Sequence, residues 1–243
     1  MSTTPEERLP FSAWGTKGFE FWTFLSVLLK AAHPRAILEV GCGRSTTFFA
    51  DYAYAGGATY VGVENDLRWF NKTRLDIELL GFGMRHVVHV PLAADGSWYE
   101  MAGFTAATRT PGRVDFALID GPNEKLFFAS EADIAERFRP EDGNPFGHRD
   151  DPAGLRAIAT VTRDCDVMLV DDVHKMHVFR TVDRMLADPS SYEKQYFLYR
   201  PHPSVTNALC VCLRRCAPVV RQCAAVCEFL GVRLESDYRP PPS

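Results

Sequence analysis

Several acidic residues of this chain follow apolar runs that are typical of buried strands. Asp120 ends the run 114–120, and Asp171 and Asp172 end the run that begins at residue 167. Because the carboxyl ends of parallel strands meet at one edge of a sheet, we expect these carboxylates to project into one crevice. Hard divalent cations prefer oxygen ligands, and a cation would relieve the repulsion among the carboxylates. These residues therefore predict a site for Mg²⁺ or another divalent cation, and the alternative is that each aspartate caps a helix or turn.

A glycine turn lies between another apolar run and a helix start. Residues 37–47 read Ile-Leu-Glu-Val-Gly-Cys-Gly-Arg-Ser-Thr-Thr. Gly41 and Gly43 permit a tight turn and the close approach of a ligand, because neither carries a Cβ atom. Ser45 and the two threonines can cap the following helix, whose first N–H groups would face that ligand. Glu39 lies two residues before the turn, where a carboxylate suits a cationic ligand better than a pyrophosphate.

A further acid, Glu64, ends the apolar run 59–64. It follows the glycine turn by about twenty residues, a spacing at which a carboxylate can accept two hydrogen bonds from a ribose diol. Thr46 replaces the third glycine of the dinucleotide fingerprint, which argues against a nicotinamide-dependent oxidoreductase. No Lys-Ser or Lys-Thr pair follows the turn, so the motif is not a P-loop.

Taken together, these motifs resemble those of class I S-adenosylmethionine-dependent methyltransferases. The matching segments occur in order between residues 36 and 175, as Glu-Val-Gly-Cys-Gly at 39–43, Glu64, Leu-Ile-Asp-Gly-Pro at 118–122 and Leu-Val-Asp-Asp at 169–172. The resemblance implies that the glycine turn packs against the methionine part of the cofactor and that Glu64 holds the ribose. Segment 90–99 resembles the region that contacts the adenine. The cofactor-binding residues expected on this basis are Glu39, Gly41, Gly43, Ser45, Glu64, Leu92, Ala93, Asp95 and Asp120.

The aspartates at the strand ends also resemble those of the catechol and caffeoyl-CoA type of divalent-cation-dependent O-methyltransferase. In that type the metal lowers the pKa of a substrate hydroxyl, whose oxygen attacks the sulfonium methyl group in line. This chain departs from the pattern at two positions, because Asp172 replaces an asparagine and Asn123 replaces a lysine. If no metal is bound, His174 is the candidate general base, since histidine titrates near neutral pH.

We therefore expect an S-adenosylmethionine-dependent methyltransferase that methylates a hydroxyl of a small molecule, with or without a metal. Asp120 and His174 are the candidate catalytic residues. Two alternatives stay open. One is a metal-independent enzyme that uses His174 as base, and the other is a binding protein that keeps the cofactor fold without catalysis. Trp98 and Tyr99 either shape an acceptor pocket or belong to the core.

The elements that must position these residues alternate between strands and helices, which favours an α/β fold with a mostly parallel, doubly wound sheet. The expected strands are 36–40, 59–64, 86–90, 114–120, 167–171, 194–199 and 208–214. The expected helices are 19–32, 46–54, 67–80 and 181–186. The resemblance implies a seven-stranded Rossmann-like sheet with an antiparallel last strand.

Length and composition favour one soluble domain, because the chain has 243 residues, of which 46% are hydrophobic and 24% charged. We expect a flexible segment over 1–15, the domain over 16–238 and a disordered tail over 239–243. Residues 123–153 are rich in turn formers and charge, and form either a lid over the substrate or a surface insertion.

The expected partners follow from charge and hydropathy. A net charge of -4 argues against a nucleic-acid substrate. The polar N-terminus lacks a signal-peptide core, and the apolar run 19–29 is too short to span a bilayer. We expect a cytoplasmic protein that acts on a small-molecule acceptor and does not associate with a membrane. Whether the protein forms a homodimer stays open. Cysteines cluster near the C-terminus, but their spacing favours buried side chains over a zinc site.

Overall fold

The computed structural model describes a large part of the chain. The described residues are 18–82, 86–94, 98–109, 112–122, 157–158, 160–163, 165–173, 179, 182, 192–202, 205–214 and 234–239. The elements in chain order are α2 (Gly18–Ala32), β1 (Ala36–Val40), α3 (Arg44–Gly56), β2 (Thr59–Glu64), α4 (Leu67–Leu79), β3 (Val87–His89), α5 (Met101–Arg109), β4 (Phe116–Ile119), β5 (Val167–Val170), β6 (Tyr192–His202), β7 (Val205–Arg214) and β8 (Leu234–Glu235).

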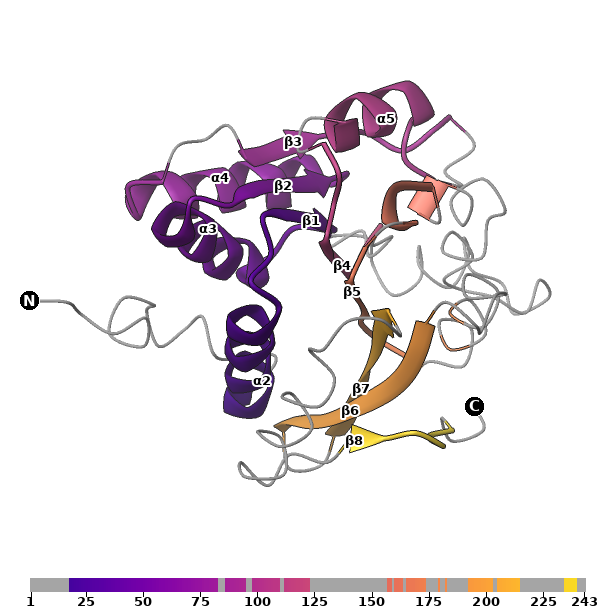
Figure 1. Cartoon of the computed structure of the whole chain (residues 1–243). Coiled ribbons are helices and arrows are strands. Elements are labelled where there is room, and N and C mark those ends of the chain that lie inside the picture. Colours follow the sequence, from indigo (N-terminus) through magenta and orange to yellow (C-terminus); the bar gives the residue numbers. More distant parts are fainter. Residues whose placement is uncertain are drawn as a thin grey trace, which may run out of the picture.

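The strands form one sheet in the order β3-β2-β1-β4-β5-β7-β6-β8 (Figure 1). Strands β1 to β5 pair in parallel, whereas β7 runs antiparallel to both β5 and β6. The predicted α/β fold, with a mostly parallel sheet and an antiparallel strand near the end, is confirmed. The sheet has eight strands rather than seven, because the two residues of β8 pair with β6 at the edge.

Two apolar cores cover the two faces of this sheet. The first lies under α2 and α3 and includes Phe49, Phe116 and Leu118. The second lies under α5 and includes Phe104 and Ile119. Because successive strand residues point to opposite faces, neighbouring residues of β4 enter different cores. We call these the α3 face and the α5 face.

Helix α2 closes the α3 face over the antiparallel end of the sheet (Figure 1). Phe24 of α2 stacks on Phe197 of β6 with ring centroids 4.3 Å apart. Phe21 lies against Tyr199 of the same strand, with centroids 5.2 Å apart. These contacts attach the N-terminal helix to strands that are far from it in the sequence.

Some expectations fall outside the part of the chain that the structure describes. They concern the N-terminal segment 1–15, the lid over 123–153, the tail beyond residue 239, and the helix 181–186 except for Val182. Within the described residues, no helix has the length and apolar character needed to cross a bilayer. Cys210 and Cys212 are buried in the core of the α5 face, with their sulfur atoms 3.7 Å apart.

Candidate functional site

Four carboxylates lie at the carboxyl-terminal edge of the parallel strands. Glu39 belongs to β1 and Glu64 ends β2, while Asp120 and Asp171 directly follow β4 and β5. A core residue lies one or two positions before each carboxylate. Because successive strand residues point to opposite faces of the sheet, that core residue shows which face the carboxylate points to. By that alternation all four side chains point to the α3 face. The structure thus brings the predicted Asp120 and Asp171 to the same edge of the sheet as Glu39 and Glu64.

Glu39 is fully buried beneath the glycine turn. Its carboxylate accepts hydrogen bonds from the hydroxyls of Ser45, Thr46 and Tyr60, with Thr46 Oγ1 at 2.7 Å. Burial raises the pKa of Glu39 to about 7, although these hydrogen bonds oppose the shift; the charge of Asp120 adds to it. In this structure the Glu39 carboxylate thus holds the start of α3 in place against β1 and β2.

Gly43 forms the N-cap of α3 and faces open space. Its N–H donates to Thr46 Oγ1 at 2.9 Å, so the same hydroxyl that binds Glu39 also fixes the turn. A Cβ atom at Gly43 would meet no atom within 4 Å. The room beside this glycine is where a ligand could approach the backbone.

Gly41, in contrast, contacts a neighbouring turn. Its φ is +87°, and a Cβ atom there would lie 2.6 Å from the nitrogen of Gly121. A Cβ atom at Gly121 would in turn lie 2.6 Å from the Gly41 Cα and 3.0 Å from the Tyr99 hydroxyl. The turn after β1 and the turn after β4 therefore touch backbone to backbone. The sequence analysis assigned Gly41 to a ligand. It included Gly121 in the Leu-Ile-Asp-Gly-Pro segment but gave this glycine no role, although Asp-Gly-Pro after an apolar run marks a turn.

Glu64 joins the end of β2 to the glycine turn. One of its carboxylate oxygens accepts from the Cys42 N–H at 2.7 Å, and the other accepts from the Asp66 N–H at 2.7 Å. The side chain is 4% exposed, and burial raises the pKa of Glu64 to about 7. The backbone N–H of Asn65 is a third hydrogen-bond partner of this carboxylate. A carboxylate offers about four lone-pair sites, so Glu64 keeps the capacity to accept a further hydrogen bond.

The region expected to contact an adenine is partly described. The Ala93 N–H donates to the Trp98 carbonyl at 2.7 Å, and Leu92 forms a bridge with Tyr99. Asp95 lies outside the described residues. Asn65 follows Glu64, and within the described part of the chain its Oδ1 is buried without a hydrogen-bond partner. Sequence reasoning did not single out Asn65, because an asparagine after a strand is an ordinary turn residue.

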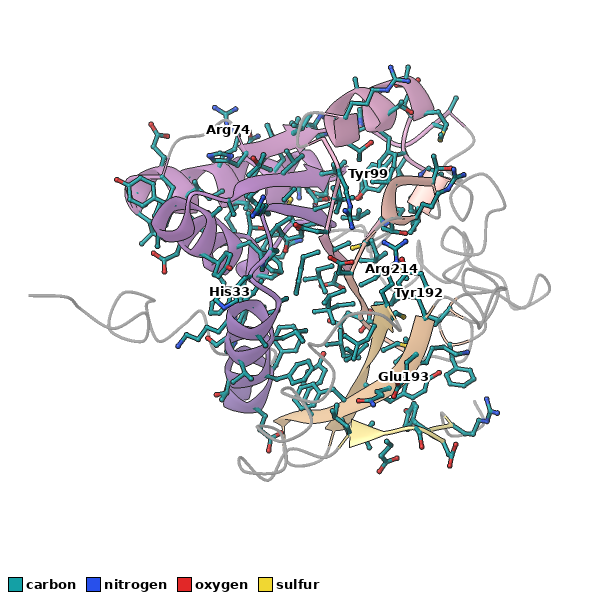
Figure 2. The ribbon with its side chains drawn as sticks, viewed as in Figure 1. His33, Arg74, Tyr99, Tyr192, Glu193 and Arg214 are labelled. Carbon is teal, nitrogen blue, oxygen red and sulfur yellow. The ribbon has the colours of Figure 1, made fainter. Side chains whose placement is uncertain are left out.

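Trp98 and Tyr99 are core residues. They are 1% and 0% exposed, and both rings pack against Phe104 of α5 with centroids 5.8 Å and 5.5 Å from it. Figure 2 labels Tyr99 between the sheet and this helix. The interpretation that these two rings form an acceptor pocket is therefore wrong, and the core alternative holds.

The predicted metal site is not formed by the described residues. Asp171 is 1% exposed, and its Oδ1 accepts from the Tyr199 hydroxyl at 3.0 Å and from the Asp172 N–H at 2.8 Å. Asp172 has a φ of 65°, a left-handed conformation that is uncommon for a residue with a side chain. No three histidine, cysteine, aspartate or glutamate side chains in this part of the structure are arranged to hold a metal ion. The strand ends bring Asp120, Asp171 and Asp172 to one edge of the sheet, but the Asp171 carboxylate is hydrogen-bonded to Tyr199 of β6. His174 lies outside the described residues.

Comparisons with known proteins identify the fold. No family model and no curated protein matches the sequence. An O-methyltransferase from Bacillus cereus in complex with SAH is 15% identical, with a TM-score of 0.52 over 88% of this chain and 83% of that chain. A candidate O-methyltransferase from Klebsiella pneumoniae is 15% identical, with a TM-score of 0.53 over 81% and 80% of the two chains. A spermidine synthase from Thermotoga maritima is 12% identical, with a TM-score of 0.50 over 85% of this chain and 63% of that chain. The chain therefore has the fold of class I S-adenosylmethionine-dependent methyltransferases.

Proposed function

We propose that this chain is an S-adenosylmethionine-dependent methyltransferase that methylates a hydroxyl group of a small molecule. The observation that carries the proposal is the placement of Glu64. Its buried carboxylate is bonded to the glycine turn at Cys42 and lies at the same sheet edge as the open space beside Gly43. A carboxylate at the end of β2 in this fold is placed to accept hydrogen bonds from a ribose diol.

The residues of the site fit the cofactor in distinct roles. Glu64 accepts from the ribose hydroxyls, and the first N–H groups of α3 with Gly43 border the methionine part. Glu39 acts through Ser45 and Thr46 as a positioning residue that holds this turn. When bound, the cofactor supplies a methyl group that its sulfonium has already activated.

The proton of the acceptor hydroxyl needs a base at the same edge. Asp120 lies there, close enough to Glu39 for its charge to raise the pKa of that residue, and His174 is the second candidate. The described aspartates do not form a site for a divalent cation, so in this proposal a side chain of the protein accepts the proton. The O-methyltransferases among the structural neighbours support an oxygen acceptor, whereas the spermidine synthase keeps an amine acceptor open.

Calorimetric titration of the full chain with S-adenosylhomocysteine tests this proposal. We expect micromolar affinity in the wild type and a loss of about 10- to 100-fold in Glu64→Ala, since charge-assisted hydrogen bonds contribute about 1.5–3 kcal/mol each. Glu100→Ala is a matched control, because Glu100 also accepts from two backbone N–H groups but lies at the start of α5. Its affinity should stay within about twofold of the wild type.

The 2′-deoxy form of S-adenosylhomocysteine separates ribose recognition from damage to the turn. Removal of the hydroxyl should weaken binding to the wild type and leave binding to Glu64→Ala unchanged, because the interaction is already lost there. An equal loss in both proteins would show that Glu64 does not bind the ribose. Failure of the wild type to bind S-adenosylhomocysteine would overturn the proposed enzyme, and binding of NAD instead would indicate an oxidoreductase.

A further inference from the structure

Exposed apolar side chains gather on helices α3 and α4. Among the described residues, five large apolar side chains are exposed, and four of them lie on these two helices: Tyr54, Leu67, Leu75 and Leu79. Apolar side chains that are exposed singly are normal on a protein surface, whereas a group of them on one surface marks an interaction site. The two helices lie side by side over strands β1 to β3 (Figure 1).

The C-terminal half of α4 carries the most exposed part of this surface. Leu75 and Leu79 are 54% and 76% exposed and lie one helical turn apart. The Tyr54 ring, which is 75% exposed, contacts the ring of Phe82 just beyond α4, with centroids 5.4 Å apart. The opposite side of α4 is buried, because Ile77 packs in the core of the α3 face. We call Tyr54, Leu75, Leu79 and Phe82 the α4 patch.

Charged residues flank the α4 patch on two sides. Lys72 and Glu78 are exposed and lie three residues before and after Leu75, so they occupy opposite flanks of it on the helix. Lys72 Nζ lies 2.6 Å from Asp76 of its own helix and 5.6 Å from the Trp69 ring. An ammonium has three donors and this side chain is 56% exposed, so Lys72 can pair with a further acid. Within the described part of the chain, Glu78 forms no ion pair.

This arrangement is self-complementary. Two identical copies usually associate about a two-fold axis, so that the same surface of each copy meets itself. A two-fold axis beside Leu75, with the α4 helices crossing at about 50° as in the commonest packing class, brings Leu75 and Leu79 of the two copies together. The same axis places Lys72 of each copy beside Glu78 of the other, because these residues lie on opposite flanks. An apolar centre with a polar rim is the usual composition of a protein interface.

Other kinds of partner fit the α4 patch less well. A membrane surface with anionic lipids attracts clustered basic residues, whereas Asp76 and Glu78 border this patch. A small ligand needs a concave site that encloses it, whereas the patch lies on the outer, convex surface of a helix. The pairing of Lys72 with Glu78 is specific to a second copy of the same helix.

We propose that this chain forms a homodimer in which the α4 patches of two copies meet about a two-fold axis, with Lys72 of each copy paired to Glu78 of the other. The inference does not depend on the proposed methyltransferase activity. Glu64 lies near the start of α4, and the 13 residues of this helix span about 20 Å. Because the patch lies at the other end of α4, the dimer leaves both cofactor sites open.

Sedimentation velocity of the full chain from about 1 to about 300 µM tests the inference. We expect a dissociation constant on the order of 50 µM, because an interface of one helix per copy is at the small end of stable interfaces. At the few micromolar used in unfolding experiments the monomer then predominates. Leu75→Glu/Leu79→Glu should weaken association at least about tenfold, since it places charges at the apolar centre. Met101→Glu is the matched control, because Met101 is an exposed apolar residue of α5, on the other face of the sheet, and should stay within about twofold.

A pair of charge variants tests the contact between Lys72 and Glu78. In a homodimer of Glu78→Lys, or of Lys72→Glu, like charges lie beside one another, so each variant alone should associate at least about fivefold more weakly than the wild type. In an equimolar mixture of the two variants, both contacts again join opposite charges. We therefore expect a heterodimer whose affinity is within about threefold of that of the wild type.

Each of these measurements can contradict the homodimer. A wild type that stays monomeric up to about 300 µM would overturn the inference and would leave the α4 patch to a different protein. A dimer that Leu75→Glu/Leu79→Glu leaves unchanged, or that Met101→Glu weakens equally, would overturn it as well, and so would a mixture of the charge variants that stays monomeric. S-adenosylhomocysteine should bind the wild type and the leucine variant equally, so a failure to bind it bears on the proposed function alone.

Discussion

Glu39 and Glu64 show how single residues combine structural and binding roles at this edge of the sheet. Both carboxylates are buried, and both have pKa values raised to about 7. Glu64 bonds to backbone N–H groups and keeps free acceptor capacity, whereas Glu39 is bonded to three hydroxyls of the chain itself. The two carboxylates therefore differ in how many hydrogen bonds they can still accept from a ligand, although both are buried.

The raised pKa of Glu39 makes folding stability depend on pH. Between its ordinary value of 4.5 and about 7, the folded state binds more protons than the unfolded state, so the free energy of unfolding falls as the pH rises. In Glu39→Gln this contribution is absent, and the hydroxyls can rotate to accept from the amide. We expect the difference in unfolding free energy, wild type minus variant, to fall by on the order of 3 kcal/mol from about pH 4.5 to about pH 8. Urea unfolding at several pH values measures it.

Glu100→Gln provides a control of opposite sign. Backbone hydrogen bonds from Gly103 and Ala102 lower the pKa of Glu100, so its contribution is present above the ordinary value and is lost as the pH falls. A difference for Glu39→Gln that is flat or rises with pH would contradict the assignment.

The functional residues could be predicted from the sequence in part. The type and spacing of Gly43 and Glu64 indicated a turn and an acid that the structure brings together. The bond between Tyr60 and Glu39 could not be predicted, because it depends on the register that pairs Ile37 with Tyr60 across two parallel strands. The role of Tyr199 at Asp171 was missed for the same reason, since β6 reaches β5 only through β7.

At the scale of elements, the turns after β1 and β4 are fixed by mutual contact. We expect Gly41→Ala to lower the free energy of unfolding by at least about 2 kcal/mol, because the residue has a φ of +87° and its Cβ would overlap Gly121. Gly43→Ala, with open space at its Cβ, should cost about 1 kcal/mol or less. It should nevertheless weaken S-adenosylhomocysteine binding. Urea unfolding and calorimetry measure the two effects, and a Gly41→Ala protein as stable as Gly43→Ala would contradict the contact.

The bounds of a helix or strand were predicted most accurately where the sequence carries a clear apolar run or capping residue. The bounds of β1 and β2 are as predicted, because each is a short apolar run that ends at a turn. Helix α4 is one residue shorter than predicted and begins after Asp66, whose side chain accepts from two N–H groups of its first turn. Helix α5 was missed, because its 9 residues are fewer than the roughly 11–18 residues over which a helical period is read from a sequence.

At the scale of the whole molecule, the fold depends on contacts between distant parts of the chain. Helix α2 precedes β1 but packs on β6, which lies more than 150 residues further along the chain. We expect Phe24→Ala to lower the free energy of unfolding by about 3–5 kcal/mol and Phe24→Leu by about 1 kcal/mol, since the ring stacks on Phe197 in the core. Leu79→Ala is the control, because Leu79 is 76% exposed and should change stability by about 0.5 kcal/mol or less. Urea unfolding measures all three, and equal losses in Phe24→Ala and Leu79→Ala would contradict the packing of α2.

The alternation of strands and helices was enough to predict the fold class. It could not give the strand order, because that order depends on which faces the helices cover and not on any local pattern. The eighth strand was missed because a pair of residues carries no periodicity.

The contact between Gly41 and Gly121 also constrains how this protein can change over generations. Most packing defects in a core can be repaired by a smaller residue opposite the larger one. Here a Cβ atom at either glycine would meet backbone atoms of the other turn, and although the Tyr99 hydroxyl also lies beside Gly121, a shorter side chain there would leave the backbone overlap in place. A library randomised at both positions should therefore return glycine at each, independently of the other. A substitution at one of these glycines therefore cannot be compensated by a substitution at the other.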